Sequence, residues 1–193
     1  MVSDELVWRS GLDLAAMIRK KEISPVEITE ALLTRIDALN PRLNAFCLVT
    51  PDVARVAARE AEIAVMKREP IGPLHGVPVS IKDVLYTRGI RTTGGSRLFA
   101  ELMPEEDAIA VSRLRASRAV ILGKTNTSEF GHKAVTDNPL FGPTRNPWNL
   151  DLTPRLLRRR RRRGGERPRS ARARQRRRGI RPHSGRVLWS LRS

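Results

Sequence analysis

The feature that most limits what this chain can fold into is a break in composition after Pro154. Residues 1–154 contain 20 Lys and Arg against 19 Asp and Glu, which gives a net charge of +1. Residues 155–193 contain 17 Arg against the single Glu166, a net charge of +16, and six of these arginines are consecutive at 158–163. A segment with so many like charges and so few apolar side chains cannot build a core. We therefore expect one folded region over 1–154 and a disordered Arg-rich tail over 155–193.

Cysteine usage and the N-terminal sequence indicate the compartment. Cys47 is the only cysteine, so no internal disulfide can form, and a reducing compartment is expected. We expect the thiol of Cys47 to pack as a small apolar group. The N-terminus lacks the uninterrupted apolar run of a signal peptide, and no stretch of about 18 consecutive apolar residues could span a membrane. These features predict a soluble, cytoplasmic protein with no membrane partner.

Three helices are predicted near the start of the chain. Ser24, Pro25 and Glu27 have the pattern of a helix start, with serine as N-cap, proline at the first helical position and glutamate completing a capping box. The sequence LNP then closes this helix, because the residue before a proline disfavours helical backbone. A shorter helix is expected over 12–21, and a third over about 50–68.

The middle of the chain predicts an α/β fold. Residues 77–81 alternate between apolar and polar side chains, which indicates a strand that ends at Lys82 and Asp83. Residues 107–117 have helical periodicity, and the apolar run at 119–124 indicates a buried strand. A strand, a helix and a strand in this order favour a parallel crossover unit.

Lys82 is the strongest candidate for chemistry. It follows an apolar strand and is therefore expected near the core, where desolvation disfavours an ammonium and allows the lysine to act as a general base. The alternative is a strand-end lysine that extends to water or pairs with Asp83.

Other polar residues have weaker patterns. His75 and His132 have no acid or thiol at a spacing that would form a metal site or a triad, so structural roles are expected. Ser96 and the run Thr125–Ser128 favour loop formation, with substrate contact as the alternative.

Four segments in order carry a family resemblance: GPLHGVPVSIKDV, TTGGSRLF, AVILGKTNTSEFG and FGPTRNPWN. Together they resemble the amidase signature family, serine hydrolases that cleave carboxamide C–N bonds, over about 1–154. The resemblance implies an α/β/α architecture with a mixed central sheet, of which this region would be the N-terminal part, and a Ser, cis-Ser, Lys triad. It also implies a small-molecule amide substrate and no metal or organic cofactor. By motif match, Lys82 in VSIKD corresponds to the catalytic lysine, which acts on the proton of the nucleophile through the bridging serine.

The resemblance ends where the arginines begin. The family continues with a Gly-Gly-Ser-Ser-Gly-Gly loop that supplies the bridging serine, and later with the nucleophile, whereas this chain has RLLRRRRRRGG. If that loop is encoded GGC GGC TCC TCC GGC GGC, reading from the third base gives Arg-Leu-Leu-Arg-Arg, which is the sequence at 155–159. The same offset makes 175–189 compatible with the motif that carries the nucleophile. We therefore expect a frameshift near codon 154 and a truncated, inactive chain.

Two other roles are possible for such a chain. The tail could bind nucleic acid, but its only aromatic residue is Trp189, so base stacking is poorly supported and only nonspecific polyanion binding is expected. Residues 1–154 could instead act as a pseudoenzyme with a protein partner. We expect such a fragment to be unstable, because the absent later strands would leave an unpaired sheet edge and uncovered apolar surface.

Overall fold

The computed structural model of the chain describes residues 6–154, and the expectations for the tail at 155–193 lie outside this range. The elements are η1 (Leu6–Trp8), α1 (Gly11–Arg19), α2 (Pro25–Leu43), β1 (Phe46–Val49), α3 (Pro51–Met66), β2 (Pro78–Lys82), η2 (Arg97–Phe99), α4 (Ile109–Ala116), β3 (Val120–Thr125) and η3 (Glu129–Gly131).

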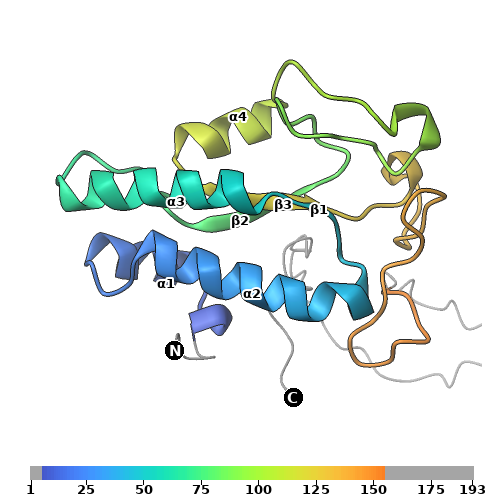
Figure 1. The fold of residues 1–193 in the computed structure, drawn as a ribbon, viewed down its shortest axis with the longest axis horizontal. Helices are drawn as coiled ribbons and strands as arrows, with labels where there is room; N and C mark the ends of the chain where they lie inside the picture. The colour runs from blue at the N-terminus through green and yellow to red at the C-terminus, as the bar shows by residue number, and fades with distance from the viewer. Residues whose placement is uncertain (1–5, 155–193) are drawn as a thin grey trace, which may run out of the picture. The chain divides into compact units, whose positions relative to one another are not determined.

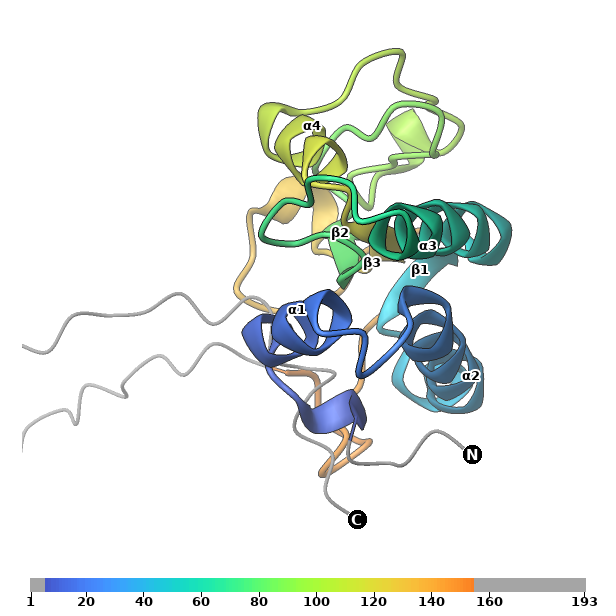
Figure 2. The ribbon, with the colours of Figure 1, turned by 90° about the vertical axis from the view of Figure 1, so that its left-hand side faces the viewer.

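The strands form a mixed sheet in the order β1-β3-β2. β2 pairs with β3 in parallel, and β1 pairs with β3 antiparallel. The parallel pair is connected through α4, which confirms the predicted crossover unit and the α/β class. Helices α1 and α2 lie on one side of the sheet, and α3 and α4 lie on the other (Figures 1 and 2).

Each of the first two helices begins with a serine cap. Ser10 forms a full capping box at α1, in which its hydroxyl accepts from the Asp13 N–H at 3.1 Å and the Asp13 carboxylate accepts from the Ser10 N–H at 3.3 Å. At α2 the hydroxyl of Ser24 accepts from the N–H groups of Val26 and Glu27. The hydroxyl itself donates to the carboxylate of Glu62 on α3. The serine cap of α2 therefore also connects two helices.

The predicted end of α2 is wrong. The helix continues through Pro41 to Leu43 and ends at Asn44, which has left-handed backbone with φ of 50°. Proline has no N–H and so removes one helical hydrogen bond, yet the helix runs on for only two residues beyond Pro41. The side-chain oxygen of Asn40 then accepts from the N–H groups of Ala45 and Phe46, at 2.9 and 2.8 Å, and directs the chain into β1.

Apolar side chains pack on both sides of the sheet. Ile81, Ile90, Val111 and Ile121 form a buried cluster between the strands and α4. On α1 and α2 the buried side chains include Leu14, Ile18, Ile28, Leu33 and Ile36. Among residues 6–154, no helix is long and apolar enough to cross a membrane.

Candidate active site

Lys82 is the last residue of β2, at the carboxyl end of the parallel strands. In the sheet it lies opposite Thr125 of β3, and the next N–H, that of Asp83, donates to the Thr125 carbonyl at 3.0 Å. Ile81 packs in the cluster beneath α4, so strand alternation places Lys82 on the opposite face of the sheet.

The expectation that Lys82 lies near the core is wrong for the described residues, since its side chain is exposed. The physical reason is the alternation of the strand, which gives the buried position to Ile81. Within 6–154 the Lys82 ammonium makes no hydrogen bond or ion pair. The backbone of Lys82 is thus fixed by the sheet, while its amine has access to solvent.

Asp83 anchors the loop that faces the end of β2. The residue is 1 % exposed, and its Oδ2 accepts from the Thr93 N–H at 3.1 Å and from the Thr93 hydroxyl at 2.5 Å. The carbonyl of Asp83 accepts from the Gly94 N–H at 2.9 Å. The loop segment TTGGS is therefore attached to the residue that directly follows Lys82.

Asp83 does not pair with Lys82, so that part of the alternative for Lys82 is wrong. Its partner is Lys124 of β3, whose Nζ lies 3.7 Å from Asp83 Oδ1. Lys124 is fully buried and lies opposite Ile81 in the register, on the α4 side of the sheet.

The Lys124 ammonium donates to three oxygens. These are the Leu85 carbonyl at 2.8 Å, the Thr87 hydroxyl at 3.1 Å and the Thr92 hydroxyl at 2.6 Å. Burial lowers the pKa of Lys124, and the neighbouring Asp83 carboxylate partly opposes this shift. Lys124 was not among the candidates selected from the sequence. Its place inside the apolar run VILGKT could have indicated a buried lysine with partners, because an unpaired lysine is rarely buried.

Two glycines allow backbones to approach closely at the site. Gly123 has φ of 150°, and a Cβ at this position would lie 2.2 Å from the Leu48 carbonyl oxygen of β1. Gly95 has φ of 69°, and its Cβ would lie 3.1 Å from the side chain of Asn138. Larger residues would separate β1 from β3 at the first position and the loop from Asn138 at the second.

Of the predicted loop run Thr125–Ser128, Thr125 is instead the last residue of β3, and the residues after it form a loop as predicted. Asn126 donates to the Gly142 carbonyl at 3.1 Å, and Asn138 donates to the Asn126 side-chain oxygen at 2.6 Å. Ser96 is buried, and its hydroxyl accepts from the Leu98 N–H at 3.4 Å. Asn138 was not among the sequence candidates, because its role depends on a contact across twelve residues of chain.

Each of the two histidines in the described region contacts a backbone carbonyl. His75 is buried, and its Nε2 lies 2.8 Å from the Ala61 carbonyl, while the exposed His132 contacts the Glu129 carbonyl. Cys47 is half-buried, and burial raises the pKa of its thiol to about 12. No group of three or more His, Cys, Asp or Glu that could hold a metal occurs in the described part of the chain.

An exposed aromatic pair lies beside the glycine loop. The rings of Phe99 and Phe130 meet edge to face, with centroids 5.9 Å apart, and their residues are 40 % and 53 % exposed. The N–H of Phe130 donates to the Gly94 carbonyl at 2.7 Å. Since Gly94 also bonds to Asp83, the pair is connected to the Lys82 strand end through two hydrogen bonds.

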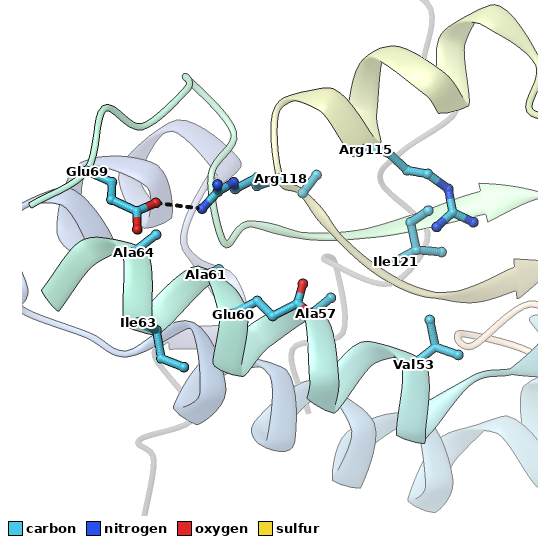
Figure 3. A pocket seen from close by; sticks show the side chains of 11 residues that line it. Val53, Ala57, Glu60, Ala61, Ile63, Ala64, Glu69, Arg115, Arg118 and Ile121 are labelled. Carbon is cyan, nitrogen blue, oxygen red and sulfur yellow. Dashed lines mark hydrogen bonds and ion pairs between the residues drawn. The ribbon is translucent and has the colours of Figure 1, made fainter. Parts of the chain in front are cut away.

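A separate groove of about 460 Å³ lies between α3 and the segment that joins α4 to β3 (Figure 3). Glu69 and Arg118 form an ion pair across it at 3.2 Å. Neither Lys82 nor Asp83 lines this groove. The groove is therefore distinct from the lysine site.

Comparison with known proteins identifies the family. The amidase family model matches residues 27–154. The chain belongs to the amidase family. A glutamyl-tRNA(Gln) amidotransferase subunit from Acidothermus cellulolyticus is 45 % identical over 150 residues, which cover 78 % of this chain and 30 % of that protein. An acylamidase of Rhodococcus erythropolis is 42 % identical over 152 residues, covering 78 % of this chain and 31 % of that protein.

Solved structures agree with this membership. A bacterial aryl acylamidase of the amidase signature family superposes with a TM-score of 0.69 at 35 % identity, covering 76 % of this chain and 31 % of that chain. The chain thus spans about 30 % of the length of these curated relatives.

The segments that carry the amidase resemblance converge in space. Hydrogen bonds connect Asp83 to Gly94, Gly94 to Phe130, and Asn126 to Gly142. Residues from four separate stretches of the amidase sequence thus meet around the carboxyl ends of β2 and β3. This edge of the sheet is therefore the candidate active site.

Proposed function

We propose that residues 1–154 are the lysine-bearing part of a Ser/cis-Ser/Lys amide hydrolase, and that Lys82 is its catalytic lysine. The observation that carries the proposal is the placement of Lys82: its backbone is held in β2, and its exposed ammonium has no partner within 6–154. Membership of the amidase family supports the reaction class, which is hydrolysis of a carboxamide C–N bond.

The proposed chemistry divides the work between lysine and serine. Lys82 acts as general base through the bridging serine, and the nucleophilic serine attacks the carbonyl carbon to form an acyl-enzyme. The C–N bond breaks with loss of ammonia or an amine, which takes up the proton, and water then releases the acid. Backbone N–H groups of a glycine-rich loop stabilise the oxyanion. No metal or organic cofactor takes part in this scheme.

The two serines are proposed to be lost through a frameshift near codon 154. The supporting observation is in the sequence: a single offset turns the Arg-Leu-Leu-Arg-Arg run at 155–159 into the serine loop of the family. The resemblance to the family also stops there, because the family model matches up to residue 154. The chain as written is therefore proposed to be inactive toward amides.

The test starts with the gene. If the nucleotide sequence of codons 150–193 encodes no Gly-Gly-Ser-Ser-Gly-Gly loop in either other frame, the frameshift proposal is wrong. A chain expressed from the restored frame is expected to hydrolyse simple carboxamides, and Lys82→Ala to lower its turnover by about a hundredfold or more. Lys67→Ala, which changes an exposed lysine at the end of α3, is the matched control and should retain activity.

The chain as written provides the complementary measurement. We expect no amide turnover above that of buffer, because both serines are missing. Measurable turnover that disappears in Lys82→Ala would overturn the proposed inactivity.

A further inference from the structure

The residues that follow Lys82 are held by a buried cation on the other face of the sheet. Lys124 contributes three hydrogen bonds of 2.6 to 3.1 Å, two to the segment after β2 and one to the glycine loop. An ammonium has three protons, so each one has an acceptor here. The contacts join Leu85 and Thr87 to Thr92.

Asp83 closes the same network from the strand. Oδ2 is saturated by the two donors of Thr93, and Oδ1 accepts no hydrogen bond within the described residues but lies 3.7 Å from the Lys124 ammonium. The Thr93 hydroxyl accepts in turn from the Gly95 N–H at 3.0 Å. Lys124 and Asp83 together thus attach the glycine loop to the end of β2.

We propose that Lys124 is a positioning residue for Lys82, fixing through the 83–92 segment the direction in which the Lys82 amine leaves the sheet. Lys124 lies opposite Ile81 and therefore on the other face from Lys82, so it acts through the backbone and not by contact with the Lys82 amine. The inference rests on the proposed role of Lys82 and adds a residue that sets its geometry.

If Lys124 had a purely structural role, the reactivity of Lys82 would be unchanged in any variant of the Lys124 network that stays folded. Trace acetylation of the full chain with acetic anhydride, read by mass spectrometry, measures each lysine separately, and the Arg-rich tail contains no lysine to interfere. Exposed Lys67 is the internal reference. Fully buried Lys124 reports on folding, because it is labelled only if its environment opens.

The decisive variant is Thr92→Val, which removes the 2.6 Å bond and keeps both charges. We expect the labelling ratio of Lys82 to Lys67 to differ from one in the native chain. In the variant we expect this ratio to move toward one by about threefold, because half the free energy that a charge-assisted hydrogen bond usually contributes corresponds to a change of that size. Thr29→Val is the matched control: Thr29 is a buried threonine on α2 whose hydroxyl has no hydrogen-bond partner among residues 6–154.

Two results would overturn the inference: equal labelling of Lys82 and Lys67 in the native chain, or an unchanged ratio in Thr92→Val with Lys124 still unlabelled. If Thr92→Val exposes Lys124, Thr87→Val, which removes the 3.1 Å bond, decides by the same criterion. The assay measures the labelling of lysines and not amide turnover. A negative result can therefore be told apart from the finding that turnover of the restored enzyme does not depend on Lys82.

Discussion

At the scale of single residues, the two lysines near the sheet edge show how one side-chain type takes opposite roles. Lys82 is the last residue of β2 and Lys124 the last but one of β3, and the register sets their side chains on opposite faces of the sheet. Lys82 is exposed without a partner in the described region, whereas Lys124 is enclosed and has three acceptors. Burial of the second ammonium is tolerable only because hydrogen bonds and a carboxylate replace its water.

Removal of the Lys124 ammonium should be costly to stability. In Lys124→Met the Asp83 carboxylate remains buried without its counter-charge, so we expect a loss of about 3 kcal/mol in the free energy of unfolding. The double variant Lys124→Met/Asp83→Asn removes both charges and should recover part of that loss. Urea unfolding followed by circular dichroism measures both, and a double variant less stable than Lys124→Met would contradict the assignment.

Cys47 should be unreactive in the native protein. Burial raises the pKa of its thiol to about 12 from an ordinary value of 9.0, so the thiolate fraction at pH 8 falls by about a thousandfold. We expect alkylation by iodoacetamide to be slow in buffer and fast in urea, with Cys47→Ser as the unlabelled control. The same shift lowers stability as pH rises above 9.0, because the unfolded chain then loses the proton first. Equal alkylation rates in buffer and urea would be inconsistent with the buried thiol.

At the scale of elements, local sequence patterns predicted most helices and strands, and long-range contacts decided the remainder. The start of α3 follows from the proline at its first position, β2 follows from alternation, and β3 follows from its apolar run. The end of α2 did not follow, because Asn44 in left-handed backbone donates to the Phe141 carbonyl at 2.6 Å, a contact across 97 positions. The burial of Lys124 likewise depends on Thr87 and Thr92, which no local pattern connects to it.

The contact between β1 and β3 should be sensitive to a methyl group added at Gly123. Gly123→Ala places a Cβ 2.2 Å from the Leu48 carbonyl oxygen, whereas Gly89→Ala also has a positive φ, 70° against 150°, but no atom within 4 Å of its Cβ. We expect Gly89→Ala to cost about 1 kcal/mol. Gly123→Ala should cost at least about 2 kcal/mol more. Thermal unfolding of the two variants measures the difference, and equal midpoints would show that strand separation carries no penalty.

At the scale of the whole molecule, the described region has surfaces that a complete domain of this family would be expected to cover. The chain spans about 30 % of the length of the relatives it matches, and α3 presents Val53, Val56, Ile63 and Met66 with about half or more of each residue exposed. β2 is an edge strand among the described residues, with Lys82 at its end. Apolar patches and open edges of this kind favour association over solubility.

The charge of the full chain should produce polyanion binding without sequence preference. With 17 Arg against one acidic residue in 155–193, counterion release makes affinity for RNA fall steeply with salt, by about a thousandfold or more between 50 and 200 mM if six or more phosphates are neutralised. A chain ending at Pro154, with a net charge of +1, should not bind. Fluorescence anisotropy with several unrelated RNAs of equal length measures this. Affinities that differ more than about tenfold among these RNAs, or binding retained by the shorter chain, would favour a selected nucleic-acid function over an accidental polycation.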